Sequence, residues 1–211
     1  LYRTWYNTQI HLWSSLGEKV VIPTKFLKKF MLCCAEKDIC FYNFNQNDTE
    51  EFINIFMNLL HESVKLKADI SVEGTPTNQI ERLQVKSVKS WSDFFKNDYS
   101  YIIQKFYSQQ LTITSCSKCD YYTLNFEPFM VLSLEIPESD STLYDCLSSY
   151  TSKTVLDADN LWTCDKCKQK VSPDKKIKLW KTSNVIIILL KRYSNRSKKD
   201  NFVEYPLQLD L

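Results

Sequence analysis

The chain has 211 residues, of which 44% are hydrophobic, 14% aromatic and 25% charged, with a formal net charge of +2 at pH 7. This apolar content is enough for a core without disulfide support, and the small net charge argues neither for nor against nucleic-acid binding. The longest apolar run, residues 185–190, falls far short of the roughly 18 residues that suggest a membrane span. We therefore expect a globular protein of one domain, or of two small ones.

The first part of the chain predicts helices. Residues 1–40 are amphipathic at helical spacing and are interrupted near Gly17 and Pro23. Residues 67–90 are polar around the turn signal EGTPTN and predict a loop or an excursion. Residues 91–110 predict a helix again.

The clearest helix covers residues 50–65, EEFINIFMNLLHESVK. Asp48 marks its start, and Glu51 follows three residues later, which makes an acidic relative of the capping box. Apolar residues recur on one face at helical spacing. They are Phe52, Ile55, Phe56, Leu59, Leu60 and Val64.

From Leu111 the pattern changes to β-branched and aromatic residues in runs of strand length. The runs are residues 111–116, 121–137, 176–180 and 184–193. A short predicted helix, residues 141–151, interrupts them and carries Leu143, Cys146, Leu147 and Tyr150 on one face. Helices followed mainly by strands predict the α+β class.

Two pairs of cysteines have the spacing of a metal site. Cys116 and Cys119 lie in CSKC, and Cys164 and Cys167 lie in CDKC. Each pair fits one tight turn, and two such turns supply the four ligands of a tetrahedral zinc ion. The alternative is a set of core or redox thiols. A site with four protein ligands has no open position, so the expected zinc ion is structural.

The surroundings of these turns suit a metal only in part. Four thiolates around Zn²⁺ carry a formal charge of −2, which nearby lysines would offset. These lysines are Lys118, Lys166, Lys168 and Lys170. Such turns usually place Gly soon after the second cysteine, where the backbone is left-handed; here Asp120 and Lys168 follow.

The other four cysteines, of eight in all, lie in apolar helical settings and are predicted to be core residues. They are Cys33, Cys34, Cys40 and Cys146. Metal spacing rather than a disulfide framework indicates a reducing compartment. We therefore expect an intracellular protein, cytoplasmic or nuclear or both.

Several motifs, taken in chain order, resemble the ubiquitin-specific proteases, which are papain-like cysteine peptidases that cut after the C-terminal glycine of ubiquitin. Residues 46–52, QNDTEEF, resemble the family's Gln-Gln-Asp-x-x-Glu-Phe helix start. The paired cysteine turns follow, then VIIILLKRY and FVEYPLQLDL, similar to the family's Leu-Lys-Arg-Phe strand and the segment after it. The resemblance covers about residues 40–65 and 91–211.

The resemblance implies one hand-like domain that is incomplete at both ends. Residues 1–110 would form mainly thumb helices. Residues 111–180 would form mainly the zinc-ribbon fingers with adjoining palm, and residues 181–211 palm strands. In this arrangement the zinc ion ties together the fingers that grip the globular body of ubiquitin.

Three positions depart from the family pattern. Ser108-Gln109 stands where a glycine usually follows an aromatic residue, and Thr154 stands where an acid is common. The segment KTSNV, residues 181–185, lacks the usual proline before the palm strand. We expect the fold to tolerate each of these point changes.

No catalytic residue is assigned within this chain. A thiol peptidase needs a nucleophilic Cys and a His that deprotonates it, and the family's segments for both are missing. His11 and His61 are predicted helix residues without a partner cysteine, and Cys33 and Cys34 lie in the wrong context. We expect the chain to begin after the nucleophile, to end before the His, and to be inactive alone.

Asp48 and Glu51 are the candidate ubiquitin-binding residues. The resemblance implies that they face the basic, extended C-terminal tail of ubiquitin. Acidic residues in the first turn also stabilise a helix without any ligand, and one carboxylate can serve both purposes. The basic run Lys191–Asp200 is interpreted as a solvated loop between palm strands rather than a nucleic-acid patch.

Three functions remain open. The first is the central part of a deubiquitinase, whose catalytic residues lie outside the chain, and the second is an inactive scaffold that binds ubiquitin. The third, an unrelated zinc ribbon on nucleic acid, needs a basic surface that a charge of +2 does not suggest. The first is favoured, with ubiquitin or ubiquitinated proteins as partners and with no nucleic acid or membrane.

Overall fold

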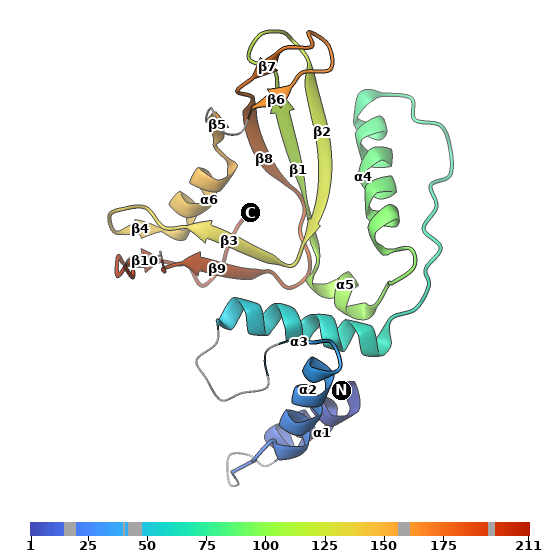
Figure 1. Ribbon diagram of the computed structural model, residues 1–211, viewed down its shortest axis with the longest axis vertical. Coiled ribbons are helices and arrows are strands. Elements are labelled where there is room, and N and C mark those ends of the chain that lie inside the picture. The colour runs from blue at the N-terminus through green and yellow to red at the C-terminus, as the bar shows by residue number, and fades with distance from the viewer. Residues whose placement is uncertain (15–19, 40, 42–47, 156–160, 194–196) are drawn as a thin grey trace. The chain divides into compact units, whose positions relative to one another are not determined.

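The computed structural model describes residues 1–211 except 15–19, 40, 42–47, 156–160 and 194–196 (Figure 1). The chain divides into two compact units. Unit 1 comprises Leu1–Ala68 and Lys96–Gln104, and unit 2 comprises Asp69–Phe95 and Lys105–Leu211. Unit 1 is helical and unit 2 is mainly β, as an α+β fold requires. Among the described residues, no helix is both long and apolar enough to cross a membrane.

Unit 1 is built around an aromatic core. It contains α1 (Tyr2–Ser14), α2 (Thr24–Ala35), α3 (Thr49–Val64) and the start of α5 (Tyr101–Phe106). The ring of Phe56 meets Trp5 and Phe26 edge-on, with centroids 5.0 and 5.7 Å apart. Phe26, Phe30, Cys34 and Leu59 are buried in this cluster. The apolar face predicted for residues 50–65 thus packs against α1 and α2.

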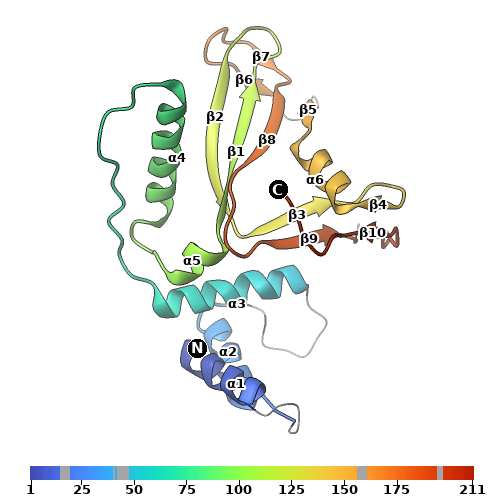
Figure 2. The same cartoon turned by 180° about the vertical axis from the view of Figure 1, so that it is seen from behind.

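Unit 2 contains a four-stranded antiparallel sheet in the order β2-β1-β8-β5 (Figures 1 and 2). Its strands are β1 (Ser108–Ser115), β2 (Tyr122–Phe129), β8 (Asp174–Lys181) and β5 (Lys153–Val155). Leu111 pairs with Phe126 on one side and with Lys178 on the other. β5 pairs with Asp174, Lys175 and Lys176 of β8.

The remaining strands of unit 2 form three two-stranded pairs. β3 (Val131–Glu135) runs parallel to β9 (Ile187–Lys191), and β4 (Ser141–Thr142) runs parallel to β10 (Val203–Glu204). β6 (Trp162–Thr163) and β7 (Lys170–Val171) are antiparallel.

The predicted short helix is confirmed as α6 (Leu143–Thr151). A capping box between Thr142 and Asp145 starts it, because the side chain of each accepts from the backbone N–H of the other. Its apolar face packs into a core with β3 and β10. The buried members are Leu132, Leu134, Ile136, Leu143, Cys146, Leu147 and Val203.

The loop predicted for residues 67–90 is wrong in its second half, which belongs to α4 (Gln79–Phe95). Serines occupy inner positions of this helix. Ser87 Oγ donates to the side-chain oxygen of Gln109 at 2.6 Å, and Ser90 Oγ donates to the carbonyl of Phe126 at 2.7 Å. Polar residues thus fill part of the inner face, although the residues of α4 are strongly amphipathic at helical spacing, and the prediction overlooked that period. The helix predicted for residues 91–110 also ends early, since β1 begins at Ser108.

Ser108 and Ser183, which lie at two of the positions that differ from the family pattern, form hydrogen bonds with each other in unit 2. Ser108 Oγ accepts from the backbone N–H of Ser183 at 3.0 Å, and the two hydroxyls lie 2.9 Å apart. The amide of Gln109 donates to the carbonyl of Ser87 at 3.1 Å. Ser108 and Gln109 are each 1% exposed, so these bonds replace water for buried polar groups. A proline at 183 would have no N–H to donate.

We predict that Gln109→Ala lowers the free energy of unfolding by about 2 kcal/mol, because the buried hydroxyl of Ser87 loses its acceptor. The matched control is Gln84→Ala on the exposed side of α4, which should stay within about 0.5 kcal/mol of the parent. Urea unfolding of both variants measures the difference. Equal stabilities would contradict a structural role for the Gln109 bonds.

Candidate metal centre and acidic helix start

The four cysteines of the two turns converge in unit 2. The sulfurs of Cys116, Cys119, Cys164 and Cys167 all lie within 4.8 Å of one another. Cys116 and Cys167 are 3.8 Å apart at Sγ, and Cys119 and Cys164 are 3.6 Å apart. Four sulfur donors around one point fit the tetrahedral coordination of a metal ion such as zinc.

The two turns share one backbone pattern. The N–H of Cys116 donates to the carbonyl of Tyr121 at 2.9 Å, and that of Cys164 donates to Gln169 at 3.0 Å. Lys168 has a φ of 56°, the left-handed conformation that usually favours glycine, whereas Asp120 does not. The left-handed conformation costs a residue with a side chain about 1–2 kcal/mol of conformational free energy. The second turn therefore holds Lys168 in an unfavourable backbone conformation.

Side chains from both turns pack around the sulfurs. The ring of Tyr121 stacks on Trp162 with centroids 6.0 Å apart, and Val171 is buried beside the cluster. Lys166 forms an ion pair with Asp120 across the two turns, and this pairing lowers the pKa of Asp120. The strongest partner of Lys166 is Asp120, and its charge also interacts with the sulfurs of Cys119 and Cys164.

The thiols differ in how readily they ionise. Burial disfavours the thiolate of Cys164, but the backbone N–H groups of Cys167 and Lys166 stabilise it and lower its pKa to about 7. At Cys119 the N–H of Tyr121 favours the thiolate, but burial and the neighbouring sulfurs raise the pKa to about 12. A cation that binds all four sulfurs must displace protons, so its affinity depends on pH.

The predicted start of α3 is confirmed at Asp48. Its backbone is extended, with φ −73° and ψ 134°, and its Oδ1 accepts from Glu50 N at 2.7 Å and Glu51 N at 3.2 Å. Both bonds use one carboxylate oxygen, and the side chains of Asp48 and Glu51 are exposed. The capping role is therefore shown, and the role of both residues in ubiquitin binding stays a prediction.

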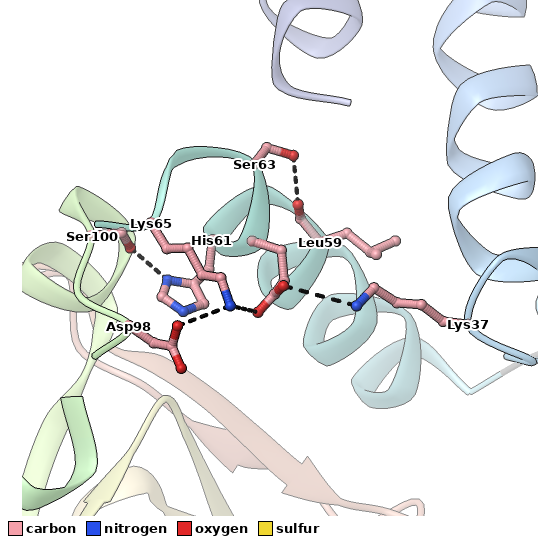
Figure 3. Close-up of polar contacts among 8 residues, drawn as sticks. Lys37, Leu59, His61, Ser63, Lys65, Asp98 and Ser100 are labelled. Carbon is pink, nitrogen blue, oxygen red and sulfur yellow. Dashed lines mark hydrogen bonds and ion pairs between the residues drawn. The ribbon is translucent and has the colours of Figure 1, made fainter. Parts of the chain in front are cut away.

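Neither histidine is bonded to a cysteine within the described part of the chain. His11 is exposed on α1. His61, near the end of α3, has its Nδ1 2.8 Å from Ser100 Oγ (Figure 3). This contact has no signal in the sequence, because the two residues are 39 positions apart and belong to no known motif.

The other cysteines are placed as core residues where the structure describes them. Cys34 is fully buried in the aromatic cluster, and burial raises the pKa of its thiol. Cys33 is half-buried against the same cluster, and Cys146 is buried with α6. Cys40 lies outside the described residues.

The basic run Lys191–Asp200 bonds to its own chain where it is described. Lys191 Nζ lies 2.9 Å from Glu135, and Lys199 Nζ lies 2.7 Å from Glu138. Arg192 donates to the carbonyl of Asn201 at 2.8 Å. These contacts suit the interpretation as a loop between strands.

We predict that the protein binds one divalent metal ion and that Cys164→Ser lowers its metal content and thermal stability. The apparent affinity should fall as the pH is lowered from 8 to 6, because protons compete for the thiolates of Cys164 and its neighbours. Elemental analysis and competition with a chelator measure this. Cys33→Ser is the control, and equal metal content in both variants would contradict the assignment.

The comparisons with known proteins agree on one family. The family model for ubiquitin carboxyl-terminal hydrolase matches residues 2–211. Ubiquitin carboxyl-terminal hydrolase 4 of Saccharomyces cerevisiae is 31% identical over 239 residues, which cover 98% of this chain and 26% of that protein. Ubiquitin carboxyl-terminal hydrolase 2 of Gallus gallus is 31% identical over 215 residues, which cover 95% of this chain and 57% of that protein.

The fold has a counterpart among solved structures. The SAGA Ubp8/Sgf11/Sus1/Sgf73 DUB module bound to ubiquitin aldehyde matches with a TM-score of 0.54 and 22% identity. The match covers 83% of this chain and 34% of that chain. The present chain thus spans between about a quarter and somewhat more than half of the relatives it matches. The match of the family model over residues 2–211 shows that the chain belongs to the ubiquitin carboxyl-terminal hydrolase family.

Proposed function

We propose that this chain is the ubiquitin-gripping part of a cysteine-type deubiquitinase, which hydrolyses the bond after the C-terminal glycine of ubiquitin. The observation that carries the proposal is the family match over residues 2–211. The structure supports it with two features that suit a protein substrate: a four-cysteine cluster between β ribbons and an exposed acidic helix start.

The four-cysteine cluster is proposed to hold one structural Zn²⁺ ion. Its four sulfurs fill a tetrahedral shell and leave no position for a substrate or a water molecule. The ion would cross-link the turn between β1 and β2 to the turn between β6 and β7. It therefore shapes a surface that can hold the globular body of ubiquitin, and it takes no part in hydrolysis.

Asp48 and Glu51 are proposed to bind the C-terminal tail of ubiquitin. That tail is basic, and exposed carboxylates pair with guanidinium and ammonium groups through charge-assisted hydrogen bonds. Asp48 uses Oδ1 to cap α3. Its second oxygen is available to a ligand on the same carboxylate.

The nucleophilic Cys and its His are proposed to come from outside this chain. In a thiol peptidase the His takes the proton of the Cys, and the thiolate attacks the carbonyl carbon of the scissile bond. Neither described histidine pairs with a cysteine, and the sulfurs of the metal centre point at one another. The role of residues 1–211 is then to bind and orient ubiquitin.

A second candidate function is an inactive scaffold that binds ubiquitin. The absence of a bonded Cys–His pair among the described residues favours it as much as it favours a catalytic centre elsewhere in the protein. Both candidates use the same gripping surface, so they differ only in chemistry. For either we propose a reducing intracellular compartment, because four converging thiols keep their metal-binding form only while they are not oxidised.

The decisive experiment treats the full-length protein with ubiquitin that bears a thiol-reactive group at its C-terminus. We expect the intact mass to increase by one ubiquitin, because the enzyme has a nucleophilic Cys outside residues 1–211. No adduct with reversible binding intact would indicate the scaffold. Neither adduct nor binding would overturn the proposal that this protein recognises ubiquitin.

The acidic helix start is tested by Asp48→Asn and Asp48→Ala. The amide of Asn still caps the helix, whereas Ala removes the cap and destabilises the protein by about 1 kcal/mol. We expect both variants to weaken ubiquitin binding about two- to fivefold, the value of one exposed ion pair. Calorimetric titration measures the affinity, and an unchanged Kd for Asp48→Asn would remove the tail-binding role.

A further inference from the structure

The end of α3 is tied to a separate segment of unit 1 by a group of polar contacts (Figure 3). His61 Nδ1 lies 2.8 Å from Ser100 Oγ, and Ser100 is only 2% exposed. Two backbone bonds of 2.8 Å join Leu66 and Tyr99 beside this contact. The last turn of α3 is therefore attached to residues 96–104, which return to unit 1 after the excursion of residues 69–95.

The hydrogen-bond partners of Ser100 are compatible with a neutral His61 whose Nδ1 accepts. The backbone N–H of Ile103 donates to Ser100 Oγ at 3.3 Å. The hydroxyl hydrogen of Ser100 is then free to donate, and Nδ1 of a neutral imidazole is an acceptor at the right distance. A protonated His61 would instead offer a second donor, and the buried hydroxyl hydrogen of Ser100 would lose its acceptor.

Charged groups from both sides face His61. Lys65 Nζ bridges Glu62 at 3.1 Å and Asp98 at 2.8 Å, and Lys37 approaches Glu62 from the end of α2 at 3.9 Å (Figure 3). Burial lowers the pKa of His61, and Lys65 adds to this effect, while Glu62 and Asp98 oppose it. The net direction is downward, so the folded protein favours neutral His61.

The same helix carries the candidate ligands of ubiquitin at its other end. α3 has 16 residues, which corresponds to a length of about 24 Å. Phe52, in its first turn, and Phe56, at its middle, pack in the aromatic cluster. Asp48 and Glu51 lie at the start of α3, so the orientation of the helix axis sets the position of their carboxylates.

We propose that His61 and Ser100 form a pH-sensitive latch that fixes α3 and thereby positions Asp48 and Glu51 for the basic tail of ubiquitin. The ubiquitin part of this inference rests on the proposed function; the latch itself does not. His61 acts through the helix and touches no substrate, so it is a positioning residue.

The sign of the pH effect follows from the lowered pKa of His61. A group whose pKa is depressed by folding stabilises the folded state above its unfolded pKa, which is about 6.5 for His. That stability is lost as the pH falls through the depressed folded pKa. The latch is therefore closed at pH 7.5 and weakens under acidic conditions.

The test compares variants of the full-length protein by hydrogen–deuterium exchange of residues 49–64 and by titration with ubiquitin. Ser100→Ala and His61→Ala open the latch. His61→Asn keeps an acceptor near the place of Nδ1 but cannot be protonated. The matched controls are Ser63→Ala, which removes a hydroxyl bonded within α3 to the carbonyl of Leu59, and His11→Asn on α1.

At pH 7.5 we expect Ser100→Ala and His61→Ala to lower protection factors about tenfold in both the last and the first turn of α3 and to raise the Kd for ubiquitin by a similar factor. His61→Asn should restore the parent values and abolish their change between pH 7.5 and 5.5. Both controls should behave like the parent.

Two results would overturn the latch. One is a loss of protection that stays within the last turn of α3, and the other is a pH dependence that His61→Asn retains. If the parent does not bind ubiquitin, the proposed function fails. The exchange data then still decide whether His61 and Ser100 position the first turn of α3.

Discussion

The repulsion that four converging cysteine sulfurs would experience as thiolates is a constraint on the two cysteine turns of unit 2. Four sulfurs within 4.8 Å cannot all become thiolates unless a cation balances them. Cys164 ionises easily because backbone N–H groups point at it, whereas its neighbours raise the pKa of Cys119. The four sulfurs could therefore hold a metal ion, and such an ion would join two turns that are far apart in the sequence.

The two units are stabilised by different kinds of contact. Unit 1 relies on aromatic rings, which contribute edge-to-face contacts in addition to the burial of apolar area. Unit 2 places α4 on its sheet through serine hydroxyls that bond to Gln109 and to the carbonyl of Phe126. Apolar contacts tolerate small displacements, but hydrogen bonds do not. The serine bonds of α4 act together with the aromatic contacts of its buried Phe95.

Local chemistry was readable from the sequence, and contacts between distant residues were not. The spacing of Cys116, Cys119, Cys164 and Cys167 predicted their convergence, since metal ligands follow narrow spacing rules. Asp48 was predictable as a cap because capping acts within three residues. The start of α4 was missed because the prediction gave the polar composition around EGTPTN more weight than the helical amphipathic period of residues 79–95, and the bond of His61 to Ser100 has no sequence signature.

The bond between Ser108 and Ser183 has a consequence for how this chain can change over evolutionary time. The family resemblance implies a glycine at the pair Ser108-Gln109 and a proline in the segment KTSNV, which contains Ser183, and the two serines are hydrogen-bonded to each other. A mutation to glycine at 108 leaves the N–H of Ser183 without its acceptor. A mutation to proline at 183 leaves the hydroxyl of Ser108 without its partner. We expect each substitution alone to lower stability, and both together to leave it unchanged. The two positions are thus expected to evolve as a pair, and a history of single substitutions must pass through a less stable intermediate.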